Sequence, residues 1–223
     1  MRAAISPSLM CMDFLKVKEQ MLTMNQWADY YHADIMDGHF CKNITLSPDM
    51  VKAFASVADK PVDVHLMTTD PGDWIELVAK AGATFISPHA ETINTDAFRI
   101  LQLIQSLGCK AGVVLNPATP LGYIEHYLNR IDILTLMTVD VGFAGQPFIP
   151  EMLDKIRQAK ELREKKGYHY LIQIDGSCNH KTFAELRQAG ADIFIVGSSG
   201  LFGIHEDLGT ACRMLTEELE TLG

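Results

Sequence analysis

Short apolar runs alternate with longer amphipathic segments along the whole chain. The short runs are rich in β-branched residues and have the length of buried strands, whereas the longer segments repeat their apolar positions every three to four residues, as helices do. Helical spacing is clearest at Phe98, Leu101 and Ile104. Strands are predicted at Ala3–Ser8, Tyr30–Met36, Pro61–Leu66, Thr84–Pro88, Lys110–Leu115, Ile131–Met137, Tyr170–Asp175 and Asp192–Val196. Helices are predicted at Phe14–Ala28, Pro48–Val57, Asp73–Lys80, Thr95–Leu107, Leu121–Asn129, Pro150–Lys165, Lys181–Gln188 and Glu206–Leu222.

This strict alternation predicts an α/β fold with a parallel sheet, because parallel strands need a crossover segment between them. Glycines follow several predicted helices, as at Gly82, Gly108 and Gly167, which is typical of helix ends. Eight strand–helix units indicate a (β/α)8 TIM barrel, which we expect to form a single domain over residues 1–223. An open doubly wound sheet is the alternative, but the first strand runs into Ser6–Met10 without the glycine fingerprint of nucleotide-binding sheets.

Composition supports a single globular unit. With 223 residues, of which 48% are hydrophobic and 21% charged, the chain can bury a full core within the usual size of one barrel. No apolar run reaches the length of a membrane span, and Met1-Arg2 leads directly into the first predicted strand without a signal-peptide core. The cysteines are odd in number and scattered, which favours reduced thiols in a cytoplasmic protein: Cys11, Cys41, Cys109, Cys178 and Cys212.

The charge balance argues against a nucleic-acid partner. A formal net charge of −9 is unfavourable for binding a phosphate backbone, which needs clustered Lys and Arg. Only Lys165-Lys166 approaches a basic run, and the end of a solvated helix accounts for it. We therefore expect small-molecule chemistry, with neither a nucleic-acid nor a membrane partner.

Polar residues stand at the carboxyl end of nearly every predicted strand, which is the rim where barrel enzymes carry their active sites. Each residue alone has a structural explanation of about equal weight, such as a helix cap or a buried histidine with a hydrogen-bond partner. Their accumulation at one rim favours function. The residues are Ser8, His32, Asp34, Asp63, His65, His89, Glu91, Asn116, Thr138, Asp175 and Ser198.

Four of these residues suit a divalent metal. His32 and Asp34 are two positions apart on a strand, so both side chains project to the same face, and His65 lies on the next strand. Asp175 comes from the seventh strand, so barrel closure places Asp34 and Asp175 on opposite walls of one cavity. That arrangement can remove a proton from one face of a carbon and return it to the other. Turn-capping carboxylates are the alternative for both aspartates, because glycines follow them closely.

Three loops that follow the sixth, seventh and eighth strands have the composition of a phosphate site. Backbone N–H groups in such turns bind a dianion without Lys or Arg, and phosphate sites in these barrels follow the seventh and eighth strands. Ordinary turn chemistry explains any one loop about as well, but three adjacent loops favour phosphate. The expected substrate contacts in these loops are Gly142, Phe143, Ala144, Gly145, Gly176, Ser177, Gly197, Ser198 and Ser199.

These segments together resemble the ribulose-phosphate 3-epimerase family. The resemblance runs in order from the first strand to the last, and its most specific part is His32–Phe40. Its other parts are Ser6–Met10, Asp63–Met67, Gly142–Phe148, Ile174–Gly176 and Val196–Ser198. The resemblance implies that His32, Asp34, His65 and Asp175 bind one divalent ion, that Asp34 and Asp175 are the catalytic acid/base pair, and that Ser8, His65 and Asp175 contact substrate. It also implies that Met36, Met67 and Met137 cover the reacting carbons, although packing in the core explains them equally well.

Several positions look closest to the D-allulose-6-phosphate 3-epimerase branch of this family. Asp175-Gly176-Ser177 stands where ribulose epimerases typically carry Asp-Gly-Gly, and Ala144 replaces a usual glycine. Val141 departs from both branches. The resemblance therefore implies inversion at C3 of D-allulose 6-phosphate to give D-fructose 6-phosphate, with D-ribulose 5-phosphate to D-xylulose 5-phosphate as the alternative.

The implied enzyme is an isomerase that needs zinc, manganese, cobalt or iron(II), requires no organic cofactor, and forms a homo-oligomer, either a dimer or a hexamer. A phosphate-binding barrel lyase or aldolase is a further alternative. A Schiff-base aldolase would need an inward lysine at a strand end, and no predicted strand end carries one. A non-catalytic phosphate-binding barrel would not need the metal residues.

Overall fold

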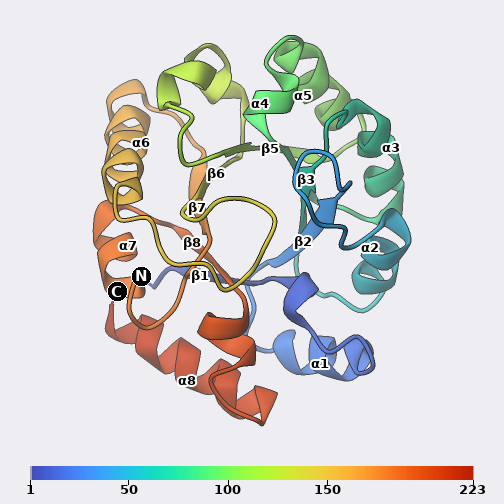
Figure 1. Ribbon diagram of the computed structural model, residues 1–223, viewed down its shortest axis with the longest axis vertical. Helices are drawn as coiled ribbons and strands as arrows, with labels where there is room; N and C mark the ends of the chain where they lie inside the picture. Colours follow the sequence, from blue (N-terminus) through green and yellow to red (C-terminus); the bar gives the residue numbers. More distant parts are fainter. Residues whose placement is uncertain (1, 223) are drawn as a thin grey trace.

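Eight parallel strands surround a central axis in the computed structural model, which describes residues 2–222 (Figure 1). The strands are β1 (Ala4–Pro7), β2 (Tyr31–Met36), β3 (Val62–Met67), β4 (Phe85–Pro88), β5 (Lys110–Leu115), β6 (Ile133–Met137), β7 (Leu171–Asp175) and β8 (Ile193–Val196). Their spatial order is β1-β8-β7-β6-β5-β4-β3-β2. Each predicted strand is present, and its ends lie within two residues of the predicted ones.

The sheet closes between β1 and β2. A parallel bridge joins Ser8 to His32, and the Ser8 N–H donates to the carbonyl of Val196 on β8 at 3.0 Å. The fold is therefore the (β/α)8 TIM barrel that the alternation of segments predicts.

Helices surround the barrel (Figure 1). The α-helices are α1 (Val17–Met24), α2 (Pro48–Ala55), α3 (Gly72–Ala81), α4 (Ala90–Ile93), α5 (Ala97–Ser106), α6 (Met152–Lys166), α7 (Phe183–Ala189) and α8 (Leu208–Thr221). Two 3₁₀ segments, η1 (Leu9–Cys11) and η2 (Leu121–Arg130), and one π-helical turn, η3 (Ser198–Phe202), complete the structure. Within residues 2–222, no helix combines the length and apolar character needed to cross a membrane.

The structure corrects the helix predictions in three places. The segment predicted as a helix at Leu121–Asn129 is a 3₁₀ helix, and its buried Leu121, Ile124 and Tyr127 recur every three residues, which is the 3₁₀ period. The first helix is shorter than predicted, since it begins at Val17 and ends at Met24. The short segments η1, α4 and η3 have too few residues to show a periodic pattern.

The barrel interior consists of an apolar layer and a polar layer. At the amino end of the strands, a cluster separate from the main core consists of Phe85, Ile133 and Ile193 with Ala4, Tyr30 and Leu171. Two positions further along these strands, the inward side chains are mostly polar and fully buried: Ser6, His32, Ser87, Thr135 and Gln173. This polar layer lies directly beneath the residues of the rim.

Candidate metal and substrate site

Four ligand atoms converge at the carboxyl end of the barrel. His65 Nδ1 lies 3.2 Å from Asp34 Oδ1 and 3.5 Å from Asp175 Oδ2. His32 Nε2 lies 3.3 Å from Asp34 Oδ1. One ligand atom from each of the four residues lies within 4.8 Å of all the others, so the structure brings together the four metal ligands expected from the sequence.

Strand register explains this convergence. In the β2–β3 ladder, Asp34 pairs with His65 and His32 pairs with Asp63. The side chains of these two pairs therefore project to the same face of the sheet, which brings His32, Asp34 and His65 together. Asp175 ends β7, which is separated from β2 by β8 and β1. Two imidazole nitrogens and two carboxylate oxygens form a donor set that suits a divalent transition metal.

Burial and neighbouring charges shift the pKa values of these groups. Burial lowers the pKa of His32, but the charge of Asp34 and hydrogen bonds to Asp34 and Asp63 outweigh burial and raise this pKa well above its usual value. Burial likewise opposes ionisation of Asp34, but His32 and His65 hold its pKa below its usual range. Burial lowers the pKa of His65, and hydrogen bonds to Asp175 and Asp34 raise it overall.

Each histidine of the cluster has a polar partner on its far side. His32 Nδ1 lies 3.0 Å from Asp63 Oδ2, and Ser87 Oγ donates to Asp63 Oδ1 at 2.5 Å. His65 Nε2 lies 2.8 Å from His89 Nε2. Asp63 and His89 were expected at the rim from their positions in the sequence, but no role was predicted for them. The two-residue spacing of Asp63 and His65 was the available signal, because it repeats the spacing of His32 and Asp34.

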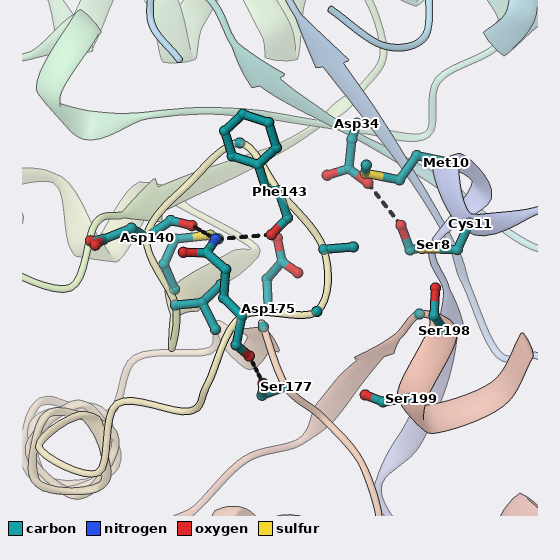
Figure 2. A pocket seen from close by; sticks show the side chains of 18 of the residues that line it. Ser8, Met10, Cys11, Asp34, Asp140, Phe143, Asp175, Ser177, Ser198 and Ser199 are labelled. Carbon is teal, nitrogen blue, oxygen red and sulfur yellow. Dashed lines mark hydrogen bonds between the residues drawn. The ribbon is translucent and has the colours of Figure 1, made fainter. Parts of the chain in front are cut away.

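A pocket opens above this cluster (Figure 2). Figure 2 shows Asp34, whose Oδ2 accepts a hydrogen bond from Ser8 Oγ at 2.8 Å, and Asp175 on a separate element of the pocket wall. His65, expected to contact substrate, is fully buried beneath the pocket and is not among its lining residues. The other expected substrate contacts all line it: Ser8, Gly142, Phe143, Ala144, Gly145, Asp175, Gly176, Ser177, Gly197, Ser198 and Ser199. Met36, Met67 and Met137 also line the pocket, together with Met10, Cys11 and Gln146.

Hydrogen bonds hold the β6–α6 loop over the pocket. Asn43 Nδ2 donates to the carbonyl of Gly142 at 2.7 Å, and Ser177 Oγ donates to the carbonyl of Gln146 at 2.5 Å. Ser177 has φ +50°, the left-handed region that glycine occupies at lower cost. Among the described residues that line this pocket, none is Lys or Arg. An anion bound here would therefore be held by backbone amides and hydroxyl groups.

Comparison with known proteins identifies the family. Residues 4–202 match the model of the ribulose-phosphate 3-epimerase family. The chain belongs to this family. A ribulose-phosphate 3-epimerase of Bacillus subtilis is 43% identical over 197 residues, covering 87% of this chain and 90% of that protein. One from Aquifex aeolicus is 42% identical over 212 residues, covering 95% and 94%. As a member of this family, the protein is an enzyme of the isomerase class, a carbohydrate-phosphate epimerase.

Solved structures at much lower sequence identity support the fold alone. KGPDC from Streptococcus mutans has a TM-score of 0.77 at 14% identity and covers 99% of this chain and 98% of its own. 3-Hexulose-6-phosphate synthase has a TM-score of 0.73 at 14% identity and covers 97% and 99%.

Proposed function

We propose that this epimerase inverts C3 of D-ribulose 5-phosphate, with Asp34 and Asp175 as the proton-transferring pair. The observation that carries the proposal is that both carboxylates belong to one His/Asp cluster at the floor of the pocket while projecting from strands that lie on either side of β1 and β8. A substrate carbon above the cluster would then have one carboxylate near each face.

In the proposed reaction, one aspartate removes the C3 proton and the other returns a proton to the opposite face. A divalent ion held by His32, Asp34, His65 and Asp175 would act as a Lewis acid that stabilises negative charge on the substrate oxygens. The C3 hydrogen is acidic because the adjacent C2 carbonyl takes up the charge, giving an enediolate. Ser8 positions Asp34 by donating to its Oδ2. The two aspartates exchange the roles of acid and base when the reaction runs in reverse.

We place the substrate phosphate at the loops after β6, β7 and β8. Gly176 and Gly197 line the pocket, and both lie close to side chains of neighbouring residues. A Cβ at Gly176, where φ is +113°, would lie 2.7 Å from a Val139 methyl, and one at Gly197 would lie 3.0 Å from Cys11 Sγ. A side chain at either position would therefore displace a neighbouring residue of the pocket wall, whereas glycine lets the backbone of these loops line the pocket.

Gly197→Leu is expected to raise KM for the sugar phosphate by about tenfold or more, equal to about 1.4 kcal/mol of lost binding. The leucine side chain would press against Cys11 in the pocket wall and displace the loop backbone that lines the pocket. Steady-state kinetics measure the effect, and Gly122→Leu is a matched control because Gly122 lies on η2 with no neighbouring atom near a Cβ. Equal kcat/KM on the sugar and the sugar phosphate would contradict the phosphate assignment.

The buried lysine Lys155 is not available for the covalent chemistry of a Schiff-base aldolase. Lys155 on α6 donates from Nζ to the carbonyls of Asn116, Pro117 and Thr119 at 3.0, 2.6 and 2.7 Å. Its amine is fully engaged with the backbone, and Lys155 does not line the pocket.

Substrate length is the finer question. The relatives named as ribulose-phosphate 3-epimerases support D-ribulose 5-phosphate over D-allulose 6-phosphate, which the resemblance of the sequence had favoured. Allulose 6-phosphate remains the second candidate because Ser177 stands at the edge of the pocket where a glycine is usual in ribulose epimerases, and its hydroxyl is bound to the β6–α6 loop.

The two candidates are separated by a direct comparison of kcat/KM. We expect D-ribulose 5-phosphate to be turned over at least about tenfold more efficiently than D-allulose 6-phosphate, a difference of about 1.4 kcal/mol in the transition state. The assay follows formation of xylulose 5-phosphate and fructose 6-phosphate with one enzyme preparation. A preference for allulose 6-phosphate would reverse the assignment.

A further inference from the structure

A buried chain of hydrogen bonds leads from the metal cluster to a carboxylate outside it. His65 Nε2 lies 2.8 Å from His89 Nε2, and His89 Nδ1 lies 3.2 Å from Glu91 Oε2. Both imidazoles are fully buried, whereas the Glu91 side chain is 22% exposed. Phe40 packs on the His89 ring with centroids 4.6 Å apart, which fixes the ring in place. Neither His89 nor Glu91 lines the substrate pocket, so neither is a catalytic residue.

A neutral imidazole carries one proton, so one ring nitrogen donates and the other accepts. This fixes the direction of each hydrogen bond between His65, His89 and Glu91. His65 directs Nδ1 at the cluster, so a metal-binding His65 carries its single proton on Nε2. That N–H must donate to His89 Nε2, which is therefore an acceptor. The proton of a neutral His89 is then on Nδ1 and faces Glu91. A carboxylate accepts this hydrogen bond, since it offers no proton of its own.

Glu91 is itself held as an acceptor on its other oxygen. The backbone N–H of Asn116 donates to Oε1 at 2.9 Å, and Thr119 Oγ1 donates to the same atom. Lys155 Nζ stabilises the loop after β5 by donating to the carbonyls of Asn116, Pro117 and Thr119. A backbone N–H cannot become an acceptor, so Oε1 of Glu91 must remain one, and the direction derived from His65 is consistent with both oxygens of an ionised Glu91 acting as acceptors.

We propose that His89 and Glu91 are positioning residues that hold His65 in the tautomer whose Nδ1 lone pair is free for the metal. The inference rests on the metal site of the proposed function. It extends to His65 the arrangement seen at His32, where Asp63 accepts directly from the ring. In metal sites generally, such outer partners fix the tautomer and the basicity of a ligand.

The substitution Glu91→Gln tests the direction of the chain. The introduced amide oxygen has to face the Asn116 N–H and Thr119 hydroxyl, which leaves the amide NH₂ group facing His89 Nδ1. His89 then moves its proton to Nε2, where it opposes the His65 Nε2–H. We expect the dissociation constant for zinc, measured by chelator competition, to rise about 10- to 100-fold.

The substitution Asp63→Asn provides the matched comparison at the other histidine. The introduced amide can keep its oxygen on His32 Nδ1 and donate its NH₂ group to Ser87 Oγ, because a hydroxyl can also accept. We expect a smaller loss of zinc affinity and an unchanged His32 tautomer. Glu76→Gln on α3, an exposed glutamate paired with Lys80, should leave zinc affinity unchanged.

The second readout is the ring tautomer, from two-bond ¹H–¹⁵N NMR spectra of the imidazoles. Zinc-loaded wild-type protein should carry the His89 proton on Nδ1, and Glu91→Gln should move it to Nε2. The proposal is overturned if the dissociation constant of Glu91→Gln for zinc lies within about threefold of the wild-type value. It is also overturned if His89 of the zinc-loaded wild-type protein carries its proton on Nε2.

If Glu91→Gln does not fold, as judged by circular dichroism, His89→Phe replaces it as the test. The phenyl ring keeps the packing against Phe40 but cannot accept from His65, so zinc affinity should fall by a similar factor, and unchanged affinity overturns the proposal. Absence of zinc binding by the wild-type protein would refute the metal site itself. Wild-type binding with an unaffected variant refutes the positioning role alone.

Discussion

Replacing Asp34 or Asp175 with Asn is expected to lower kcat for epimerisation by at least about two to four orders of magnitude, the usual contribution of a positioned acid or base. The amide keeps the size of the side chain and one oxygen ligand but cannot exchange a proton with C3. Steady-state kinetics on the sugar phosphate measure the loss. Asp154→Asn on α6 is the matched control, since that carboxylate is 76% exposed and pairs only with Arg157 among the ion pairs of residues 2–222.

Solvent isotope incorporation distinguishes the two aspartates. In deuterated water the wild-type enzyme should place deuterium at C3 of the product epimer. A variant that keeps one working base should exchange the C3 hydrogen of the substrate without inverting the carbon, and the epimer that exchanges identifies the face served by the remaining aspartate. Near-normal epimerisation by both Asn variants would contradict the paired-carboxylate mechanism.

Removal of the metal is expected to abolish epimerisation. Without a cation, the cluster of His32, Asp34, His65 and Asp175 has no Lewis acid to stabilise charge on the substrate oxygens, a contribution of several kcal/mol. Prolonged chelation followed by desalting should remove activity, and manganese, cobalt or zinc should restore it. Circular dichroism of the metal-free protein serves as the control for folding. Full activity in protein shown to be metal-free by elemental analysis would refute the metal assignment.

The strands were predictable because their signal is local. Each is a short β-branched run between polar turns, and burial of both faces in a barrel requires that composition. The segment at Leu121–Asn129 was predicted with the wrong hydrogen-bond pattern, because the spacing of three between Leu121 and Ile124 and of four between Ile124 and Leu128 is also that of an α-helix. The segments η1, α4 and η3 were not predicted because they are too short to show a periodic pattern.

The candidate ligands were predictable for a related reason. His32 and Asp34, two positions apart on a strand, must share a face whatever the rest of the chain does, and barrel topology places strand ends at one rim. The partners behind the ligands were not predictable in the same way. Asp63, Ser87 and His89 are polar residues in a barrel interior, and a sequence does not show whether such a side chain finds a partner across the barrel.

The amino-acid sequence by itself determined the eight strand–helix units, the rim on which the polar residues lie and the family to which the chain belongs, because each depends on local spacing or on short motifs. Only the tertiary structure decided that Asp34 and Asp175 meet His32 and His65 within 4.8 Å, and that Glu91 reaches His65 through His89. These relations depend on the register of neighbouring strands and on barrel closure, where a shift of one residue would turn each side chain to the opposite face.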